Sequence, residues 1–197
     1  MNDIRIYSVS DQYISYLRSD ERLKNVFENK TDIRIHTRKY LGAVFSKGKF
    51  NYFIPFSSPK KTDYIVSSDG SKTIRKSIIP IIRMTTEDTV TGEVELKGTL
   101  KLSNMIPVPF SELTPYDISK EQDVSYRLIV QKEWDFIRSH RSLIYKNAQI
   151  IYNQKTKCDT LFANKSMPGY LKNTVDFHYA EEKCREFQTK NQTGGQI

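Results

Sequence analysis

The chain has 197 residues, of which 38% are hydrophobic and 27% charged. This apolar content is too high for a disordered chain, and the length predicts one domain over residues 1–197. No apolar run approaches the roughly 20 residues that cross a bilayer, and the first residues, MNDIRIYSVSD, lack the apolar stretch of a signal peptide. The formal net charge of +8 favours a nucleic-acid partner, and we expect a cytoplasmic protein without membrane association.

The N-terminal part predicts a strand and a helix. Residues 3–9 alternate between apolar and polar side chains, as a strand does. A helix should begin at Asp11, because the apolar side chains that follow recur at helical spacing. These are Tyr13, Ile14, Tyr16 and Leu17. The polar segment 19–32 separates this helix from the next strands.

A hairpin of residues 40–45 and 49–56, joined at Gly48, forms the predicted centre of the fold. Alternating aromatic and β-branched residues in its second strand are typical of a half-buried strand. Pro55 predicts an edge or a bulge near the end of that strand, since proline cannot donate to a ladder. The strand then enters a turn that should present its hydroxyls and amines to solvent, a placement suited to phosphate chemistry. These side chains are Ser57, Ser58, Lys60 and Lys61.

The rest of the chain predicts two more buried stretches, 76–83 and 94–102, with a polar loop at 85–92 and a turn at 104–109. An apolar stripe from Val130 to Ile151 has helical spacing and is interrupted at 139–142, where one helix should end and another begin. A short final helix over 175–187 and a flexible tail over 188–197 complete the expected elements.

Positive charge is concentrated in two intervals without acidic residues, one between Asp32 and Asp63 and the other at 70–86. Their cations are Arg34, Arg38, Lys39, Lys47, Lys49, Lys60, Lys61, Lys72, Arg75, Lys76 and Arg83. Cations interleaved with aromatic residues are typical of a nucleic-acid surface. The competing interpretation is a solvated basic face over core aromatics.

Conventional catalytic and metal-binding patterns are absent from the sequence. Cys158, His178 and Cys184 match no zinc spacing and lack a fourth ligand, so no metal and no cofactor are expected. Without a cluster of carboxylates, a nuclease on the basic surface would have to work without metal ions. Such an enzyme uses the 2′-hydroxyl of RNA as its nucleophile, and it needs a base, an acid and cations around the phosphorane.

Several motifs in order along the chain match one known family. The most specific are Ser-Ser-Pro-Lys-Lys and Asn-Met-Ile-Pro-Val-Pro, which end the matching segments 52–61 and 100–109. The other matching segments are Ile6-Tyr7, Tyr13-Ile-Ser-Tyr-Leu17, Arg38-Lys-Tyr-Leu-Gly42, Trp134-Asp-Phe-Ile-Arg138, Asp176-Phe177 and Glu181-Glu-Lys-Cys184. With these motifs the chain resembles the ToxN/AbiQ toxins of type III toxin–antitoxin systems, and the resemblance covers almost the whole chain.

The resemblance implies an α+β fold, a strongly twisted antiparallel sheet similar to the Kid/MazF toxin barrel with added helices, including a long C-terminal helical region. It implies a metal-independent endoribonuclease that cuts A-rich sites and leaves 2′,3′-cyclic phosphate and 5′-hydroxyl ends. It further implies inhibition by a small antitoxin RNA of repeated pseudoknots and a role in abortive infection against phage. The toxin alone would be a monomer, and with RNA it would form an RNA-bridged cyclic hetero-oligomer.

The resemblance assigns Ser58 and Lys60 to the active site and Ser57 to a neighbouring hydroxyl position. Lys60 would either stabilise the phosphorane or act as acid or base, while Ser58 would bind the scissile phosphate or position the attacking hydroxyl. Candidate RNA-groove residues are Arg38, Tyr40, Tyr13 and Lys61. For each of them a purely structural role is equally consistent with the sequence, as a buried side chain for the tyrosines and as a solvated cation for Arg38 and Lys61.

One position departs from the family pattern. Family members often carry a histidine three residues after the lysine of this turn, where this chain has Asp63. The difference leaves more of the chemistry to Lys60. A basic RNA-binding protein without catalytic activity remains the alternative.

Overall fold

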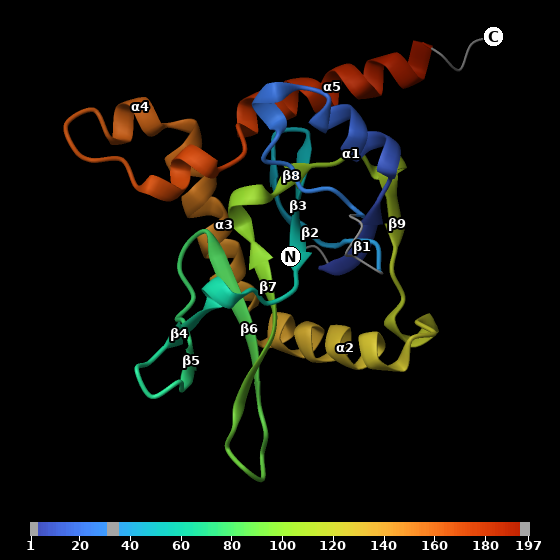
Figure 1. Ribbon diagram of the computed structural model, residues 1–197. Coiled ribbons are helices and arrows are strands. Elements are labelled where there is room, and N and C mark those ends of the chain that lie inside the picture. The colour runs from blue at the N-terminus through green and yellow to red at the C-terminus, as the bar shows by residue number, and fades with distance from the viewer. Residues whose placement is uncertain (1–3, 31–35, 194–197) are drawn as a thin grey trace.

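The structure, a computed structural model, describes residues 4–30 and 36–193 (Figure 1). An antiparallel sheet in the order β6-β7-β3-β2-β1-β9 forms its centre, and β8 pairs with β3 beside that path. A separate two-stranded sheet pairs β4 with β5. The strands are β1 (Arg5–Val9), β2 (Lys39–Lys47), β3 (Phe50–Ser57), β4 (Tyr64–Val66), β5 (Lys72–Ile74), β6 (Ile81–Glu87), β7 (Val94–Lys101), β8 (Ile106–Pro107) and β9 (Leu113–Pro115).

Helices cover the sheet at both ends. In Figure 1, α1 and α5 lie together at one end, while α2 packs against β6 and β7 at the other. Helix α3 packs against β2 and against α5. The helices are α1 (Asp11–Arg18), α2 (Val124–Ser139), α3 (Arg141–Thr156), α4 (Cys158–Leu161) and α5 (Phe177–Thr193). The predicted α+β class, an antiparallel sheet with added helices that include a C-terminal helix, is confirmed.

The predicted strand and helix at the N-terminus are confirmed as β1 and α1. Ser10 caps α1, because its side chain accepts a hydrogen bond from the Tyr13 N–H at 3.1 Å. The buried face consists of Tyr13, Ile14 and Leu17, as the spacing predicts. Within the polar segment that follows, Leu23 and Val26 also enter the core.

The central hairpin is confirmed, with β2 and β3 joined by a turn in which Gly48 adopts φ +57°. Pro55 predicts an edge or a bulge, and the first of these alternatives is wrong, because β3 lies between β2 and β7. On the side away from β2, β3 pairs with β8 up to Phe53 and with β7 from Phe56, so Pro55 falls where the partner changes. The ladder does contain a bulge, which lies between Leu41 and Phe45 of β2.

The description of β3 as a half-buried strand is also wrong. Every residue from Tyr52 to Ser57 is buried, because neighbouring elements cover both faces of this central strand. Alternation in the sequence indicated the strand correctly, but it did not show that helices and turns would cover the second face.

The predicted stretch 76–83 is wrong at its start. Strand β6 begins only after Pro80, at Ile81, and Ile78 is about half exposed. It continues to Glu87 and pairs with β7 along its length, so the predicted loop 85–92 is strand at its first three residues and loop from Asp88 onward. The predicted turn 104–109 contains β8 and contributes the buried side chains of Met105, Ile106 and Val108 to the core.

The break in the apolar stripe is confirmed, since α2 ends at Ser139 and α3 begins at Arg141. Most apolar residues of the stripe are buried, with Val130, Ile137 and Ile144 fully so, whereas Trp134 is only partly buried. The final helix is longer than predicted, because α5 runs to Thr193 and includes residues first expected in the tail. Within the described residues, no helix combines the length and apolar character of a membrane span.

Candidate active site

The turn that follows β3 presents the candidate catalytic side chains to solvent. Ser58, Lys60 and Lys61 are exposed, whereas Ser57 is buried as the last residue of the strand. The Ser57 carbonyl accepts a hydrogen bond from the Thr99 hydroxyl of β7 at 3.2 Å. The turn therefore leaves a fully packed strand, which limits the movement of Ser58 and Lys60. The prediction that Ser57 also faces solvent is wrong.

Asp63 fixes the shape of this turn. Its carboxylate accepts a hydrogen bond from the Lys60 N–H at 2.9 Å and forms an ion pair with the Arg83 guanidinium of β6 at 2.9 Å. Asp63 is 1% exposed and Arg83 6% exposed, so the pair is shielded from water. The residue that stands where the family often has histidine thus has a structural role, and its buried carboxylate does not face a bound substrate.

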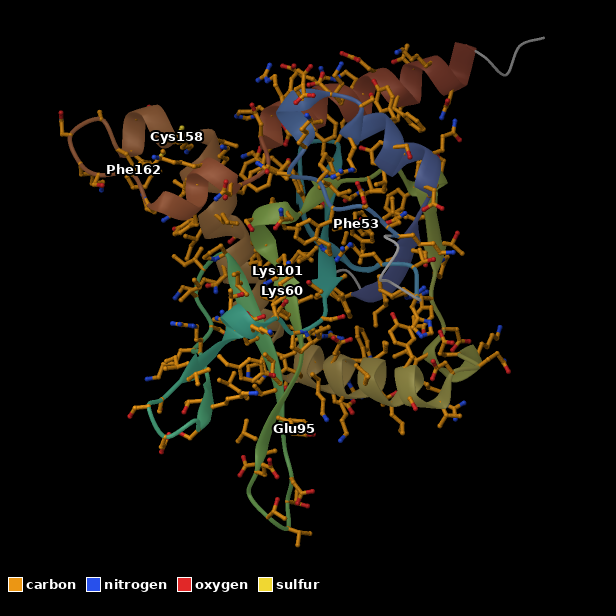
Figure 2. The ribbon with its side chains drawn as sticks, viewed as in Figure 1. Phe53, Lys60, Glu95, Lys101, Cys158 and Phe162 are labelled. Carbon is orange, nitrogen blue, oxygen red and sulfur yellow. The ribbon has the colours of Figure 1, made fainter. Side chains whose placement is uncertain are left out.

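Lys101 is a residue of this site that sequence reasoning missed. It is the last residue of β7, only 8% exposed, and Figure 2 shows it at the same end of the sheet as Lys60. Burial lowers the pKa of the Lys101 ammonium, the nearby Asp63 carboxylate opposes this shift, and the charges of Lys60 and Arg83 add to it. Its position in a predicted strand gave no signal that its side chain would lie beside a turn some forty residues earlier.

Arg38 lies beneath the same turn. Its guanidinium donates to the Phe56 carbonyl at 2.5 Å and to the Glu28 carbonyl at 2.9 Å, and the side chain is 7% exposed. Arg38 therefore attaches the end of β3 to the segment before β2. The sequence left two interpretations of Arg38 open, an RNA-groove residue and a solvated cation. Neither fits fully, because the guanidinium is buried and donates to backbone carbonyls.

Tyr40 and Tyr13 are buried tyrosines in this structure. The Tyr40 hydroxyl donates to the Asn29 side chain at 3.2 Å, and the residue is 1% exposed. Tyr13 is completely buried, and its hydroxyl donates to the Pro107 carbonyl at 2.7 Å. Burial raises the pKa of Tyr13 well above its ordinary value. Neither side chain can touch an RNA on the surface in this conformation.

The first acid-free interval is not one surface. Lys47 and Lys49 flank the β2–β3 turn, whereas Lys60 and Lys61 follow the opposite end of β3. Eight strand residues separate these ends by roughly 26 Å. Arg34 lies outside the described residues.

Cations of the second interval adjoin the candidate turn. Arg75 and Lys76 are exposed, the Arg75 N–H donates to the Asp63 carbonyl at 2.9 Å, and the Lys76 carbonyl accepts from Arg83 at 2.8 Å. Lys72 is exposed on the adjoining strand β5. Arg83 itself is buried and paired with Asp63, so its inclusion in an RNA surface is wrong.

Histidines and other possible metal ligands also lie outside this turn. Among residues 4–30 and 36–193, no group of three or more His, Cys, Asp or Glu side chains is arranged to hold a metal ion. His36 stacks on Tyr126, and His178 lies 3.2 Å from Glu181. A hollow of about 530 Å³ lies between α1 and the segment Glu28–Lys30 rather than at the turn.

Comparison with known proteins decides the family. The model of the family described as "Toxin ToxN, type III toxin-antitoxin system" matches residues 5–185. The chain belongs to the ToxN toxin family. Within this family it is 29% identical to endoribonuclease AbiQ of Lactococcus lactis subsp. lactis, over 95% of this chain and 91% of that protein. It is 24% identical to endoribonuclease ToxN of Pectobacterium atrosepticum, over 93% of this chain and 94% of that protein.

Solved structures agree with this assignment. The structure of AbiQ, a lactococcal anti-phage endoribonuclease of a type III system, superposes with a TM-score of 0.69 at 26% identity, covering 95% of this chain and 99% of that one. A structure from a bacterial type III system in which a non-coding RNA pseudoknot inhibits the toxin has a TM-score of 0.72 at 24% identity, covering 95% and 99%. The second likeness establishes the ToxN fold alone.

Proposed function

We propose that this chain is a metal-independent endoribonuclease toxin that cuts RNA at A-rich sites. The observation that carries the proposal is the exposed Ser58–Lys60 turn at the end of a buried strand, in a chain of the ToxN family. The relatives named endoribonucleases support the activity. The charge of Asp63 is already paired with Arg83, which leaves the site cationic, as phosphate binding requires.

In the proposed reaction, the 2′-hydroxyl of the substrate attacks the adjacent phosphate and the bond to the 5′-oxygen breaks. The products are a 2′,3′-cyclic phosphate and a 5′-hydroxyl. The Ser58 hydroxyl binds the scissile phosphate or orients the attacking oxygen. The Lys60 amine stabilises the phosphorane charge or transfers a proton, and Lys61 contacts the flanking RNA.

Arg38 and Tyr40, two of the remaining predicted residues, contact buried residues next to the turn. Arg38 holds the Phe56 carbonyl, and Tyr40 holds Asn29, whose backbone carbonyl accepts from the Arg38 N–H at 3.0 Å. We therefore assign Arg38 and Tyr40 as positioning residues of the RNA groove. Tyr13, which is bonded to Pro107 in the core, contributes to packing.

The proposed inhibitor is a small antitoxin RNA of repeated pseudoknots. Two solved structures support this partner, one from a type III system in which a non-coding RNA pseudoknot inhibits the toxin and one from a bacterial antiviral system that a processed non-coding RNA regulates. A folded pseudoknot that fills the cationic groove blocks substrate and holds its own 2′-hydroxyl away from in-line attack. We propose a monomeric toxin that assembles with this RNA into an RNA-bridged ring and acts in the cytoplasm in abortive infection. Light scattering of the toxin with and without RNA tests the assembly.

We also propose that residues 1–197 act as a single toxin domain whose sheet is related to the Kid/MazF barrel. The bulged β2–β3 ladder and the antiparallel order of the sheet support such a twisted sheet.

Cleavage in the presence of EDTA tests the activity. Purified protein should cut an A-rich RNA in excess EDTA and should leave the same sequence intact when every 2′-hydroxyl is methylated. Product ends are analysed with polynucleotide kinase, which phosphorylates a 5′-hydroxyl. Binding without cleavage of the unmodified RNA, with or without divalent metal, would leave the non-catalytic RNA-binding protein as the better description.

A further inference from the structure

Five buried polar side chains gather at the end of β3, and this cluster includes one charge that the proposed mechanism does not use. They are Ser57, Asp63, Arg83, Thr99 and Lys101. Strand register places Arg83, Thr99 and Ser57 in one row across β6, β7 and β3. Side chains two residues apart on a strand share a face, so Lys101 lies on the same face as Thr99.

The charges of this cluster do not balance. The Asp63 carboxylate bonds both Arg83 and the Lys60 N–H, so its negative charge is engaged. Among the residues that the structure describes, the Lys101 Nζ makes no hydrogen bond and no ion pair, and it is not among the fully buried polar atoms, so it keeps some contact with solvent. The Lys60 and Arg83 charges are near enough to lower the pKa of Lys101 further.

An ammonium on a largely buried side chain, with little solvent around it and no partner in the protein, is poorly compensated, and an anion that reaches it improves its surroundings. The exposed turn beside it is where the scissile phosphate binds in the proposed reaction. Charge-assisted hydrogen bonds to phosphate are among the stronger polar contacts that proteins make.

We propose that Lys101 is a second phosphate-binding amine of this site, which holds the scissile phosphate together with Lys60. The proposal rests on the proposed function for the identity of the ligand, an RNA phosphate. Lys101 remains an ammonium throughout and transfers no proton. Its charge offsets the negative charge that develops on the phosphorane, which leaves Lys60 available for proton transfer.

Binding of a fully 2′-O-methylated A-rich RNA tests this role, because the ligand keeps its phosphates but cannot be cut. Lys101→Met should weaken binding by about 10-fold or more, the usual effect of losing a hydrogen bond to a charged group. Lys101→Arg should retain most of the affinity. The matched control is Lys97→Met, four residues earlier on β7, where Lys97 is paired with Glu95. Figure 2 shows Glu95 toward the far end of the β6–β7 hairpin.

The second readout is the titration midpoint of Lys101 with and without RNA. If Lys101 had only a structural role, RNA would leave that midpoint unchanged. In protein labelled with [13C]lysine, the Cε signal that Lys101→Arg removes identifies the residue. Bound RNA should move its titration midpoint to higher pH, because the phosphate stabilises the charged form. An unmoved midpoint with RNA bound overturns the proposal, as does wild-type affinity in a folded Lys101→Met variant. If that variant does not fold, the midpoint alone decides.

These measurements need no cleavage, so they separate the two claims. A wild-type protein that binds the methylated RNA but never cuts unmodified RNA contradicts the proposed function and leaves the Lys101 test intact. A wild-type protein that cuts RNA while Lys101→Met cuts and binds equally well contradicts only the role of Lys101.

Discussion

Replacing Glu133 with glutamine should make the stability of the protein less dependent on pH. Glu133 lies on α2 and is 6% exposed. Its side chain packs closely on Gly98 of β7, because a Cβ atom added to that glycine would lie 3.0 Å from the Glu133 Cδ and 3.1 Å from the Met84 Cε. Removal of the carboxylate from water raises its pKa from 4.5 to about 8.

Because the folded-state pKa is the higher one, the folded protein keeps this proton over a range in which the unfolded chain has lost it. The free energy of unfolding therefore falls as pH rises through that range, at about 1.4 kcal/mol per pH unit. The loss reaches about 3 kcal/mol at pH 7 and roughly 5 kcal/mol above pH 8, as an order of magnitude. Stability from this group is fully present below pH 4.5 and is lost as pH rises to about 8.

Urea unfolding at several pH values from 4.5 to 8.5, followed by the fluorescence of Trp134, measures the effect in the wild type and in Glu133→Gln. Glutamine has no charge to lose, so the stability of the variant relative to the wild type should grow steadily with pH. Glu182→Gln, an exposed glutamate of α5, is the matched control and should show no such growth. A difference between Glu133→Gln and wild type that stays constant with pH would refute the reasoning.

Two further predictions concern the turn itself. Asp63→Asn should lower the free energy of unfolding by about 3–5 kcal/mol, because it leaves the buried Arg83 charge unpaired; urea unfolding measures this, and an unchanged midpoint would contradict the role of the pair. Changing both Lys61 and Lys76 to glutamine should lower the slope of log K against log salt for single-stranded RNA by roughly 0.7 for each lysine. Lys47→Gln, at the other end of β3, should leave that slope unchanged, and the reverse pattern would place the RNA at the hairpin tip.

The spacing of apolar residues in the sequence is sufficient to predict those elements that bury one face. The spacing of Tyr13, Ile14 and Leu17 predicted α1, and the interrupted stripe around Ser139 predicted the end of α2. Strand β9 carries no comparable signal, since its three residues become a strand only by pairing with β1, about a hundred positions earlier. Long-range pairing of that kind is not encoded in local periodicity.

In the candidate site, too, the sequence predicts some residues from local pattern and misses those that depend on long-range contacts. Ser58 and Lys60 were predictable because a strand pattern ends beside them and the family motif includes them. The buried role of Asp63 and the proximity of Lys101 depend on strands β6 and β7 folding back against this turn. The sequence predicts Arg38 as a groove residue or a solvated cation, because no local pattern shows that the Glu28 and Phe56 carbonyls bind its guanidinium.

The rate of RNA cleavage by Lys60→Ala, beside wild type and Lys47→Ala, tests the central claim most directly. All three proteins are assayed in EDTA on the same A-rich RNA, after circular dichroism has confirmed equal folding. Lys60→Ala should lose cleavage, while Lys47→Ala, which removes the same charge roughly 26 Å away, should cut close to the wild-type rate. Undiminished cleavage by Lys60→Ala would remove the turn after β3 from the chemistry and contradict the account.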